Sequence, residues 1–123
     1  MANENDNKGD GGFDLDWDDA LRVLAGIPTL KSLLLSRNDF STAPPDLGAL
    51  RHLERVWLFD CKLTRYPPGL DQLGHLNMLG LMQNALEQPV PDEVLALPKL
   101  QSLGLSKNPC YRAEKKRLKA LKP

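Results

Sequence analysis

Aliphatic residues recur at a fixed spacing along most of the chain. The pattern Leu-x-x-Leu-x-Leu, with Val once in its second position, begins at Leu30 and returns at Leu53, Leu76 and Leu100. The steps between copies are 23, 23 and 24 residues. A fixed period of this size predicts a solenoid of stacked units, because each unit is too small to bury its apolar face alone.

The residues that follow each aliphatic run repeat as well. The matching positions are Leu30, Leu33, Leu35, Asn38, Phe40, Pro44, Leu47 and Leu50, then Leu53, Val56, Leu58, Cys61, Leu63, Pro67, Leu70 and Leu73, then Leu76, Leu79, Leu81, Asn84, Leu86, Pro91, Val94 and Leu97. The fourth copy contains only Leu100, Leu103, Leu105 and Asn108, and the pattern stops at Pro109. Four registered copies are a strong signal, whereas one copy would carry none.

These residues make the chain resemble the leucine-rich repeat proteins of the small type with 23- or 24-residue repeats, over roughly residues 13 to 121. The resemblance implies an α/β fold, a solenoid with a short parallel β-sheet on its concave face and irregular or 3-10 turns on its convex side. It also implies helical caps at both ends and recognition of a partner through the strand face.

Each unit is predicted to contain one short strand. In residues 33–35, 56–58, 79–81 and 103–105 the outer positions are aliphatic, whereas the middle one changes from Leu to Trp to Gly. Such alternation is typical of a strand with one buried face. The Asn that follows turns out of the strand, and stacked units would share a ladder of amide hydrogen bonds. Cys61 replaces Asn in the second unit, and we expect a weaker rung there because a thiol is a poorer hydrogen-bonding group.

Prolines interrupt each segment that returns to the next strand. Pro44, Pro67, Pro89 and Pro91 disfavour a long regular helix, so that extended or 3-10 turns are predicted. The third return segment is one residue longer than the others and resembles the 24-residue variant of plant repeats, with Gln88 where that variant has Gly.

The chain is predicted to form one repeat domain after a short leader. Residues 1–12 are polar and rich in Gly without an apolar anchor, which predicts disorder. The domain covers residues 13–123, divided into a cap (13–29), three repeats (30–52, 53–75 and 76–99), a partial repeat (100–110) and a C-terminal capping helix (111–122).

Both ends show helical patterns that suit caps. At the start, Phe13 and Leu15 alternate as in a strand, Asp16 can cap a helix, and three apolar residues share one helical face. These three are Trp17, Leu21 and Leu24. At the other end, Leu118 and Leu121 are expected to face inward and close the last core layer, as the ends of a solenoid require.

Length and composition suit one soluble unit. The chain has 123 residues and 41% hydrophobic content, enough for a continuous core. It has no run of 18 apolar residues and no basic-then-apolar signal pattern. Cys61 and Cys110 lie two repeats apart, about 10 Å at the usual strand spacing, beyond the roughly 7 Å that a disulfide spans. Two free thiols predict a reducing compartment and a cytoplasmic location.

The formal charge balances at zero but is unevenly distributed. Residues 1–20 carry seven acidic side chains against one Lys, and residues 111–123 carry six basic side chains against one Glu. The two ends should therefore have opposite electrostatic fields. The basic end raises the alternative of an electrostatic binder of nucleic acid or anionic membrane, through Arg112, Lys115, Lys116, Arg117 and Lys119. A solvated capping face is the preferred interpretation, so that neither nucleic acid nor membrane is expected as a partner.

Metal and catalytic motifs are incomplete. Asp14, Asp16 and Asp18 have the opening spacing of a calcium loop, but Asp19 and Ala25 stand where Gly and Glu are needed. His52 and His75 lie 23 residues apart and could stack, yet that column offers no third ligand. The chain has no GxSxG, no HExxH, no phosphate-binding Gly loop and no Cys that the repeats would bring to a His. We predict no metal, no cofactor and no enzymatic activity.

The positions between the core aliphatics form the predicted binding surface. By register, four columns read Ser32, Arg55, Met78, Ser102; Leu34, Trp57, Gly80, Gly104; Ser36, Phe59, Met82, Ser106; and Arg37, Asp60, Gln83, Lys107. Five of these residues form an apolar cluster, Leu34, Trp57, Phe59, Met78 and Met82, with Trp57 as a knob beside a hollow over Gly80. Four form a polar rim, namely Arg37, Arg55, Asp60 and Gln83. Exposed aromatics with a polar rim are typical of interaction sites.

The function predicted from these patterns is a non-catalytic module that binds a protein or peptide partner through the concave strand face. Four or five strands span only about 20 Å, so that a transient, micromolar contact is expected. Three alternatives stay open: weak self-association through the aromatic cluster, the electrostatic binder, and a regulatory or targeting subunit of an enzyme on another chain.

Overall fold

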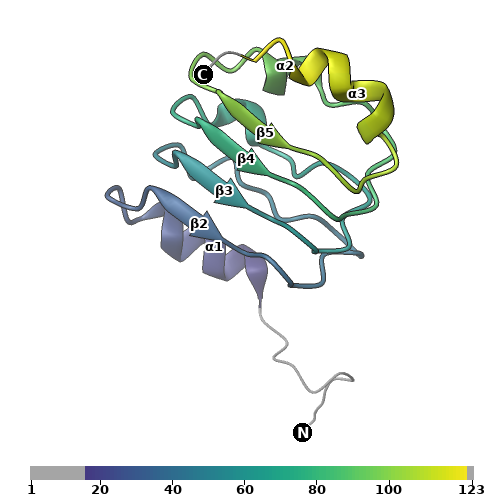
Figure 1. The fold of residues 1–123 in the computed structure, drawn as a ribbon. Helices are drawn as coiled ribbons and strands as arrows, with labels where there is room; N and C mark the ends of the chain where they lie inside the picture. Colours follow the sequence, from purple (N-terminus) through teal and green to yellow (C-terminus); the bar gives the residue numbers. More distant parts are fainter. Residues whose placement is uncertain (1–15, 122–123) are drawn as a thin grey trace, which may run out of the picture.

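The computed structural model describes residues 16–121 and contains four short strands, β2 (Ser32–Leu34), β3 (Arg55–Trp57), β4 (Met78–Gly80) and β5 (Ser102–Gly104). They form one parallel sheet in the order β2-β3-β4-β5 (Figure 1). Leu33 pairs with Val56, Val56 with Leu79, and Leu79 with Leu103. The register predicted from the repeat period is therefore confirmed at every strand pair.

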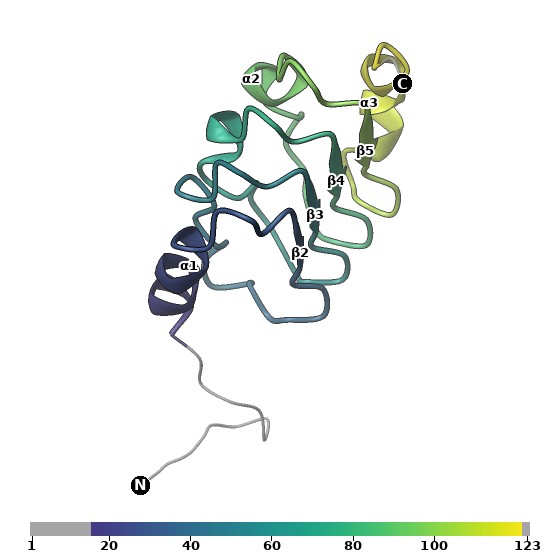
Figure 2. The same ribbon diagram turned by 90° about the vertical axis from the view of Figure 1, so that its left-hand side faces the viewer.

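Within the described residues, four helical segments accompany the sheet: α1 (Trp17–Ala25), the 3-10 helix η1 (Leu70–Gln72), α2 (Asp92–Leu95) and α3 (Tyr111–Leu118). Helix α1 lies near β2 at one end of the molecule, and α3 lies near β5 at the other (Figure 1). The strands follow one side of the molecule, and α1, η1 and α2 follow the opposite side (Figure 2). The two layers enclose the core. None of the helices within residues 16–121 is long and apolar enough to cross a membrane.

Helix α1 forms over the segment that the sequence pattern indicates. The side chain of Asp16 accepts a hydrogen bond from the Asp19 N–H at 3.2 Å and so caps the helix. Leu21 is buried, and Trp17 and Leu24 pack against the core. The ring centroids of Trp17 and Phe40 lie 5.0 Å apart. The predicted leader and the strand-like residues 13–15 lie outside the described residues.

The return segments and the last helix differ from prediction in two places. The first return segment has no helix and the second has the 3-10 helix η1, as predicted, but the third contains one α-helical turn, α2. Pro91 sits at its N-cap with φ −57°, where a proline costs no hydrogen bond. Helix α3 ends at Leu118, short of the predicted residue 122, because the chain tightens there: the Ala120 and Leu121 N–H groups donate to carbonyls only three residues back.

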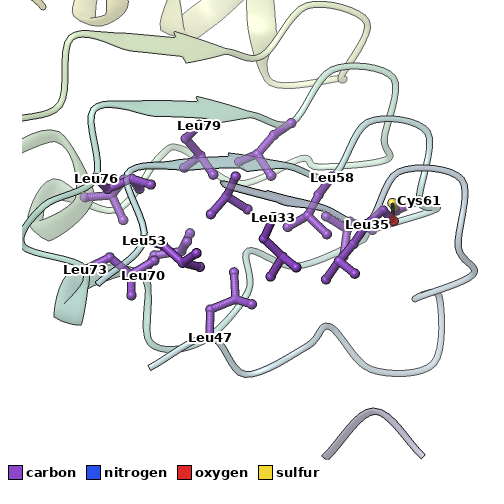
Figure 3. Packing of buried hydrophobic residues seen from close by; sticks show 14 of the residues in the cluster. Leu33, Leu35, Leu47, Leu53, Leu58, Cys61, Leu70, Leu73, Leu76 and Leu79 are labelled. Atoms are coloured by element: carbon purple, nitrogen blue, oxygen red, sulfur yellow. Dashed lines mark hydrogen bonds between the residues drawn. The ribbon is translucent and has the colours of Figure 1, made fainter. Parts of the chain in front are cut away.

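The core is a continuous column of aliphatic side chains between the two layers. The labelled leucines of Figure 3 point into this space, from the strands on one side and from the return segments on the other. Leu47, Leu53, Leu58, Leu73, Leu76 and Leu79 have no exposed surface. Two core positions depart from prediction, because Leu30 in the first repeat and Leu103 on β5 stay half-buried. Leu103 does so although Leu118 and Leu121 pack against the core.

A charged network ties α3 to the third return segment. The carboxylate of Glu114 is buried, and its Oε1 accepts hydrogen bonds from the Val90 N–H at 2.9 Å and from Arg117 Nη1 at 2.7 Å. Arg117 Nη2 pairs with Asp92 Oδ1 at 2.6 Å. Because the Val90 bond and the Asp92 pair both reach from α3 to the third return segment, hydrogen bonds as well as apolar packing set the position of α3.

The predicted ladder of amides follows the strands. Asn84 Nδ2 donates to the carbonyls of Leu58 and Leu81 at 2.9 Å, and its Oδ1 accepts from the N–H groups of Cys61 and Leu63 at 2.8 and 3.0 Å. Asn108 makes the equivalent bonds one repeat later, to the Leu81 and Leu105 carbonyls and from the Leu86 N–H. Each Asn therefore joins its own repeat to the preceding one.

Cys61 forms the thinner rung of this ladder. Its thiol donates to the Leu35 carbonyl at 3.2 Å and lies 3.6 Å from the Phe59 carbonyl oxygen. Unlike an Asn side chain, the thiol has no oxygen that can accept from the backbone of the first repeat. Burial raises the pKa of the Cys61 thiol, so that it stays protonated at neutral pH.

We expect Cys61→Asn to raise the free energy of unfolding by about 1 kcal/mol, since an amide of nearly the same volume restores the missing acceptor. Cys61→Ala should instead lower it by about 1 kcal/mol or more, because the thiol leaves a void. Urea unfolding followed by circular dichroism measures both variants. A loss of stability in both variants would show that the space around Cys61 fits a thiol better than an amide, and that no hydrogen bond is missing at this position.

Candidate partner-binding face of the sheet

The candidate site lies on the sheet face that points away from the core. Strand pairing places Leu34 beside Trp57, Trp57 beside Gly80, and Gly80 beside Gly104. A second row one residue before the core positions places Arg55 between Ser32 and Met78. Two of the four predicted columns therefore follow directly from the strand pairing, and both run across the whole sheet.

The apolar residues of this face differ in exposure. Leu34 is 68% exposed, whereas Trp57, Phe59, Met78 and Met82 are half-buried. All five predicted apolar site residues are accessible, but Leu34 protrudes most. Leu34 is left uncovered because its neighbour on β3, Trp57, leans toward β4.

The Trp57 indole leans over β4 and covers Gly80. A Cβ atom placed on Gly80 would lie 2.8 Å from Trp57 Cδ1 and 3.5 Å from Nε1. Met82 covers Gly104 in the same way, with its sulfur over the position of the missing side chain. The predicted hollow beside Trp57 is therefore wrong, because the indole itself occupies that space. Glycine on β4 and β5 allows the bulky side chains to lie flat, and they form an apolar surface across the centre of the sheet.

A stacked cation extends this surface at one end. The guanidinium carbon of Arg37 lies 5.6 Å from the centroid of the Phe59 ring, within cation–π range. The Phe59 N–H donates to Ser36 Oγ at 3.1 Å, which links β3 to the first repeat beyond the end of the strands. The hydrogen bond to Ser36 fixes the backbone of Phe59, and the Arg37 guanidinium contacts its ring.

The rim residues fall into two groups. Arg55 is half-buried and fixed, because its Nε donates to Ser32 Oγ at 2.8 Å and its Nη1 lies 3.7 Å from Glu54 Oε1. Arg37, Asp60 and Gln83 are exposed at the strand ends. Arg55 thus contributes an oriented charge and Arg37 is stacked on Phe59, whereas Asp60 and Gln83 are free to adapt to a ligand.

The exposed rim has an unusual backbone that the sequence analysis missed. Arg37, Asp60 and Gln83 have φ of 65°, 58° and 59°, and Lys107 in the same column has 61°. This left-handed conformation turns the chain out of the strand before each Asn or Cys rung. Its position before the ladder residue could have indicated it, since Asp60 is the only one of the four whose residue type is enriched in this conformation.

The other candidate sites do not assemble within the described residues. Asp16 is engaged in capping α1, and Asp14 lies outside the described part of the chain. His52 and His75 line one shallow pocket with Lys31 and Arg51. Residues 16–121 contain no cluster of three or more His, Cys, Asp or Glu side chains that could hold a metal ion.

The basic face of α3 is smaller than its sequence indicates. Arg112, Lys115, Lys116 and Lys119 are exposed. Arg117 is instead held by Glu114 and Asp92 and is only partly accessible. The predicted electrostatic binding surface therefore loses one of its five residues.

Comparison with known proteins agrees with this geometry. A sequence model described as "Leucine Rich Repeat" matches residues 29–50. The chain is 31% identical over 88 residues to Receptor-like protein 7 of Arabidopsis thaliana, an alignment that covers 72% of this chain and 9% of the relative. It is 30% identical over 90 residues to Receptor like protein 23 of the same plant, covering 72% of this chain and 10% of the relative.

The periodic sequence, the parallel sheet in repeat register and these matches identify the chain as a leucine-rich repeat protein. The chain spans about a tenth of the length of the two curated relatives. Leucine-rich repeats are in general non-enzymatic modules that mediate protein–protein interaction.

Proposed function

We propose that this chain is a non-catalytic interaction module that binds a protein or peptide partner through the outer face of its sheet. The observation that carries the proposal is the exposed apolar surface there: Leu34 is 68% exposed next to the indole of Trp57. Monomeric proteins rarely keep such side chains together on a regular surface unless a partner covers them.

Binding would bury the centre of this surface and use its rim for selection. Trp57 and Phe59 have large side chains whose motion is already restricted in the free protein. Trp57 contacts Gly80, and Phe59 contacts Arg37. Ordering them in a complex therefore costs little side-chain entropy, which is typical of interface hot spots. Arg55 offers a fixed charge, whereas Asp60 and Gln83 offer polar groups that can adapt.

We further propose that α1 and α3 act as the caps of a short solenoid. The burial of Leu21 on α1 and the buried hydrogen bonds of Glu114 on α3 support this role. A cytoplasmic location is also proposed, and its support is that Cys61 and Cys110 are both free and buried.

Retention of partners from lysate of the source organism tests the binding face. The native chain is compared with a Trp57→Ala, Phe59→Ala variant whose fold is checked by circular dichroism, and retained proteins are identified by mass spectrometry. For a partner found in this way, we expect the variant to bind at least about 30-fold more weakly by calorimetry, corresponding to about 2 kcal/mol.

A Val23→Ala, Ile27→Ala variant is the matched control. It removes two apolar side chains that are exposed in the α1 region and not on the sheet. Retention should be unchanged in this control. If the aromatic variant retains the same proteins as the native chain with equal affinity, the sheet face is not the binding site, and the basic face of α3 becomes the next surface to test.

A further inference from the structure

The free edge of β5 presents backbone donors that every other strand uses. The N–H of Leu35 donates to the Trp57 carbonyl at 2.9 Å, that of Leu58 to Gly80 at 2.8 Å, and that of Leu81 to Gly104 at 2.7 Å. Leu105 is the next residue in this series, and within residues 16–121 its N–H has no hydrogen-bond partner. The edge of the sheet therefore offers a position for one more strand.

A second series ends in the same way. The Arg37 N–H donates to the Phe59 carbonyl, Asp60 to Met82 at 3.1 Å, and Gln83 to Ser106 at 3.0 Å. Lys107 holds the equivalent position, and its N–H likewise lacks a partner in the described part of the chain. The N–H groups of Leu105 and Lys107, with one residue between them, are therefore both available on the same open edge.

A groove runs beside this edge. Its volume is about 270 Å³, and it separates β5 and the residues after it from helix α3. Its lining includes Leu103, Leu105, Tyr111, Leu118, Lys115 and Lys119. The half-buried Leu103 faces this groove from a position that is fully or nearly buried in the other three repeats. Helix α3 therefore leaves room beside β5 for an extended segment of a few residues.

The charges around the groove define the partner that fits it. Lys107, Lys115 and Lys119 are exposed, and none of them forms an ion pair with another residue between 16 and 121. Lys115 lies 5.9 Å from the centroid of the Tyr111 ring, which holds its charge near the groove. Apolar walls with a lysine rim suit a strand whose side chains alternate between apolar and acidic.

We propose that the free edge of β5 binds an extended acidic peptide, which adds a fifth strand to the sheet. Its carbonyl oxygens accept hydrogen bonds from the N–H groups of Leu105 and Lys107. Its apolar side chains contact Leu103 and Leu118, and its carboxylates pair with Lys115 and Lys119. This site is separate from the Trp57 and Phe59 surface, so that the peptide and the partner of the sheet face can bind independently.

The probe is an eight-residue peptide of alternating Asp and Val with blocked ends, titrated into the full chain labelled with nitrogen-15. We expect the largest chemical-shift changes at the Leu105 and Lys107 amides, and at least tenfold slower hydrogen exchange of both at saturation. A peptide of the same composition in block order, four Asp followed by four Val, should bind at least tenfold more weakly. Equal binding of the two peptides would overturn the proposal, because charge alone would then explain the affinity.

Matched charge reversals on α3 give the second test. Lys115→Glu with Lys119→Glu should lower the affinity for the alternating peptide at least tenfold. Arg112→Glu with Lys116→Glu, which makes an equal change of net charge outside the groove, should lower it less than threefold. Equal weakening by the two variants would overturn the proposed site.

The Trp57→Ala, Phe59→Ala variant should bind the peptide like the native chain, even if the proposed function of the sheet face fails. Shifts centred on Trp57 and Phe59, or concentration-dependent shifts of the edge amides without peptide, would assign the peptide to the other face or the edge to a second copy, and either result would overturn the proposal.

Discussion

Replacement of Asn84 by alanine is expected to lower the free energy of unfolding by about 3 to 4 kcal/mol. The side chain satisfies two carbonyls and two N–H groups, at Leu58, Leu81, Cys61 and Leu63, over distances of 2.8 to 3.0 Å. Alanine can bond none of them, although the Leu81 carbonyl keeps the hydrogen bond from Asn108 Nδ2. The backbone groups lie between packed repeats where water replaces the lost bonds poorly, so that most of the cost remains.

Asn38 provides the matched control for this experiment. It occupies the same position in the first repeat, but within residues 16–121 its Nδ2 donates only to the Leu35 carbonyl, at 2.9 Å. Asn38→Ala should therefore cost about 1 kcal/mol. Urea unfolding of both variants gives the comparison, and equal losses would show that the ladder acts through the turn of each repeat and not through bonds between repeats.

The second large loss of stability is expected when Gly69 is replaced by alanine. Its φ is 85°, in the left-handed region, and a Cβ atom there would overlap the backbone nitrogen and Cα of Gly48. Two return segments approach each other closely at this point, and the Leu47 N–H donates to the Pro68 carbonyl at 3.0 Å. Because both obstacles are backbone atoms, Gly69→Ala should lower the free energy of unfolding by about 3 kcal/mol or more.

Gly74→Ala is the corresponding control in the same return segment. A Cβ atom on Gly74 meets nothing within 4 Å, and the residue is exposed. We expect unchanged or slightly higher stability, since alanine reduces the entropy of the unfolded chain. Thermal unfolding by calorimetry distinguishes the two variants. A similar loss for both would mean that flexibility of the segment, and not the contact with Gly48, is what the glycines provide.

The sequence predicted the sheet well because one number, the repeat period, determines the register of every strand. Once Leu33 is placed opposite Val56, the core leucines and the outward columns follow from alternation alone. The ladder and its thinner rung at Cys61 followed from the same period. The period failed at Leu103, because a repeat position predicts burial only where another repeat covers it.

The site was predicted as a set of residues but not as a shape. Register places Trp57 beside Gly80 in the sequence columns, yet the direction of the indole depends on its rotamer, and glycine removes the obstacle that would keep it upright. The left-handed residues Arg37 and Gln83 carry side chains that rarely adopt this conformation, so that the surrounding hydrogen bonds impose it. Both features arise from contacts between repeats, which a single unit of sequence does not contain.

The buried thiol of Cys61 makes the junction between the first two repeats observable in solution. Burial raises its pKa, and the side chain has no exposed surface, so that a thiol reagent can react only while the rung is broken. The rate of labelling at Cys61, followed separately from that of the other free thiol, Cys110, then reports local opening of the stack at one defined place. A partner that bridges the first and second repeats would slow this labelling, so that a native residue of the chain reports occupancy.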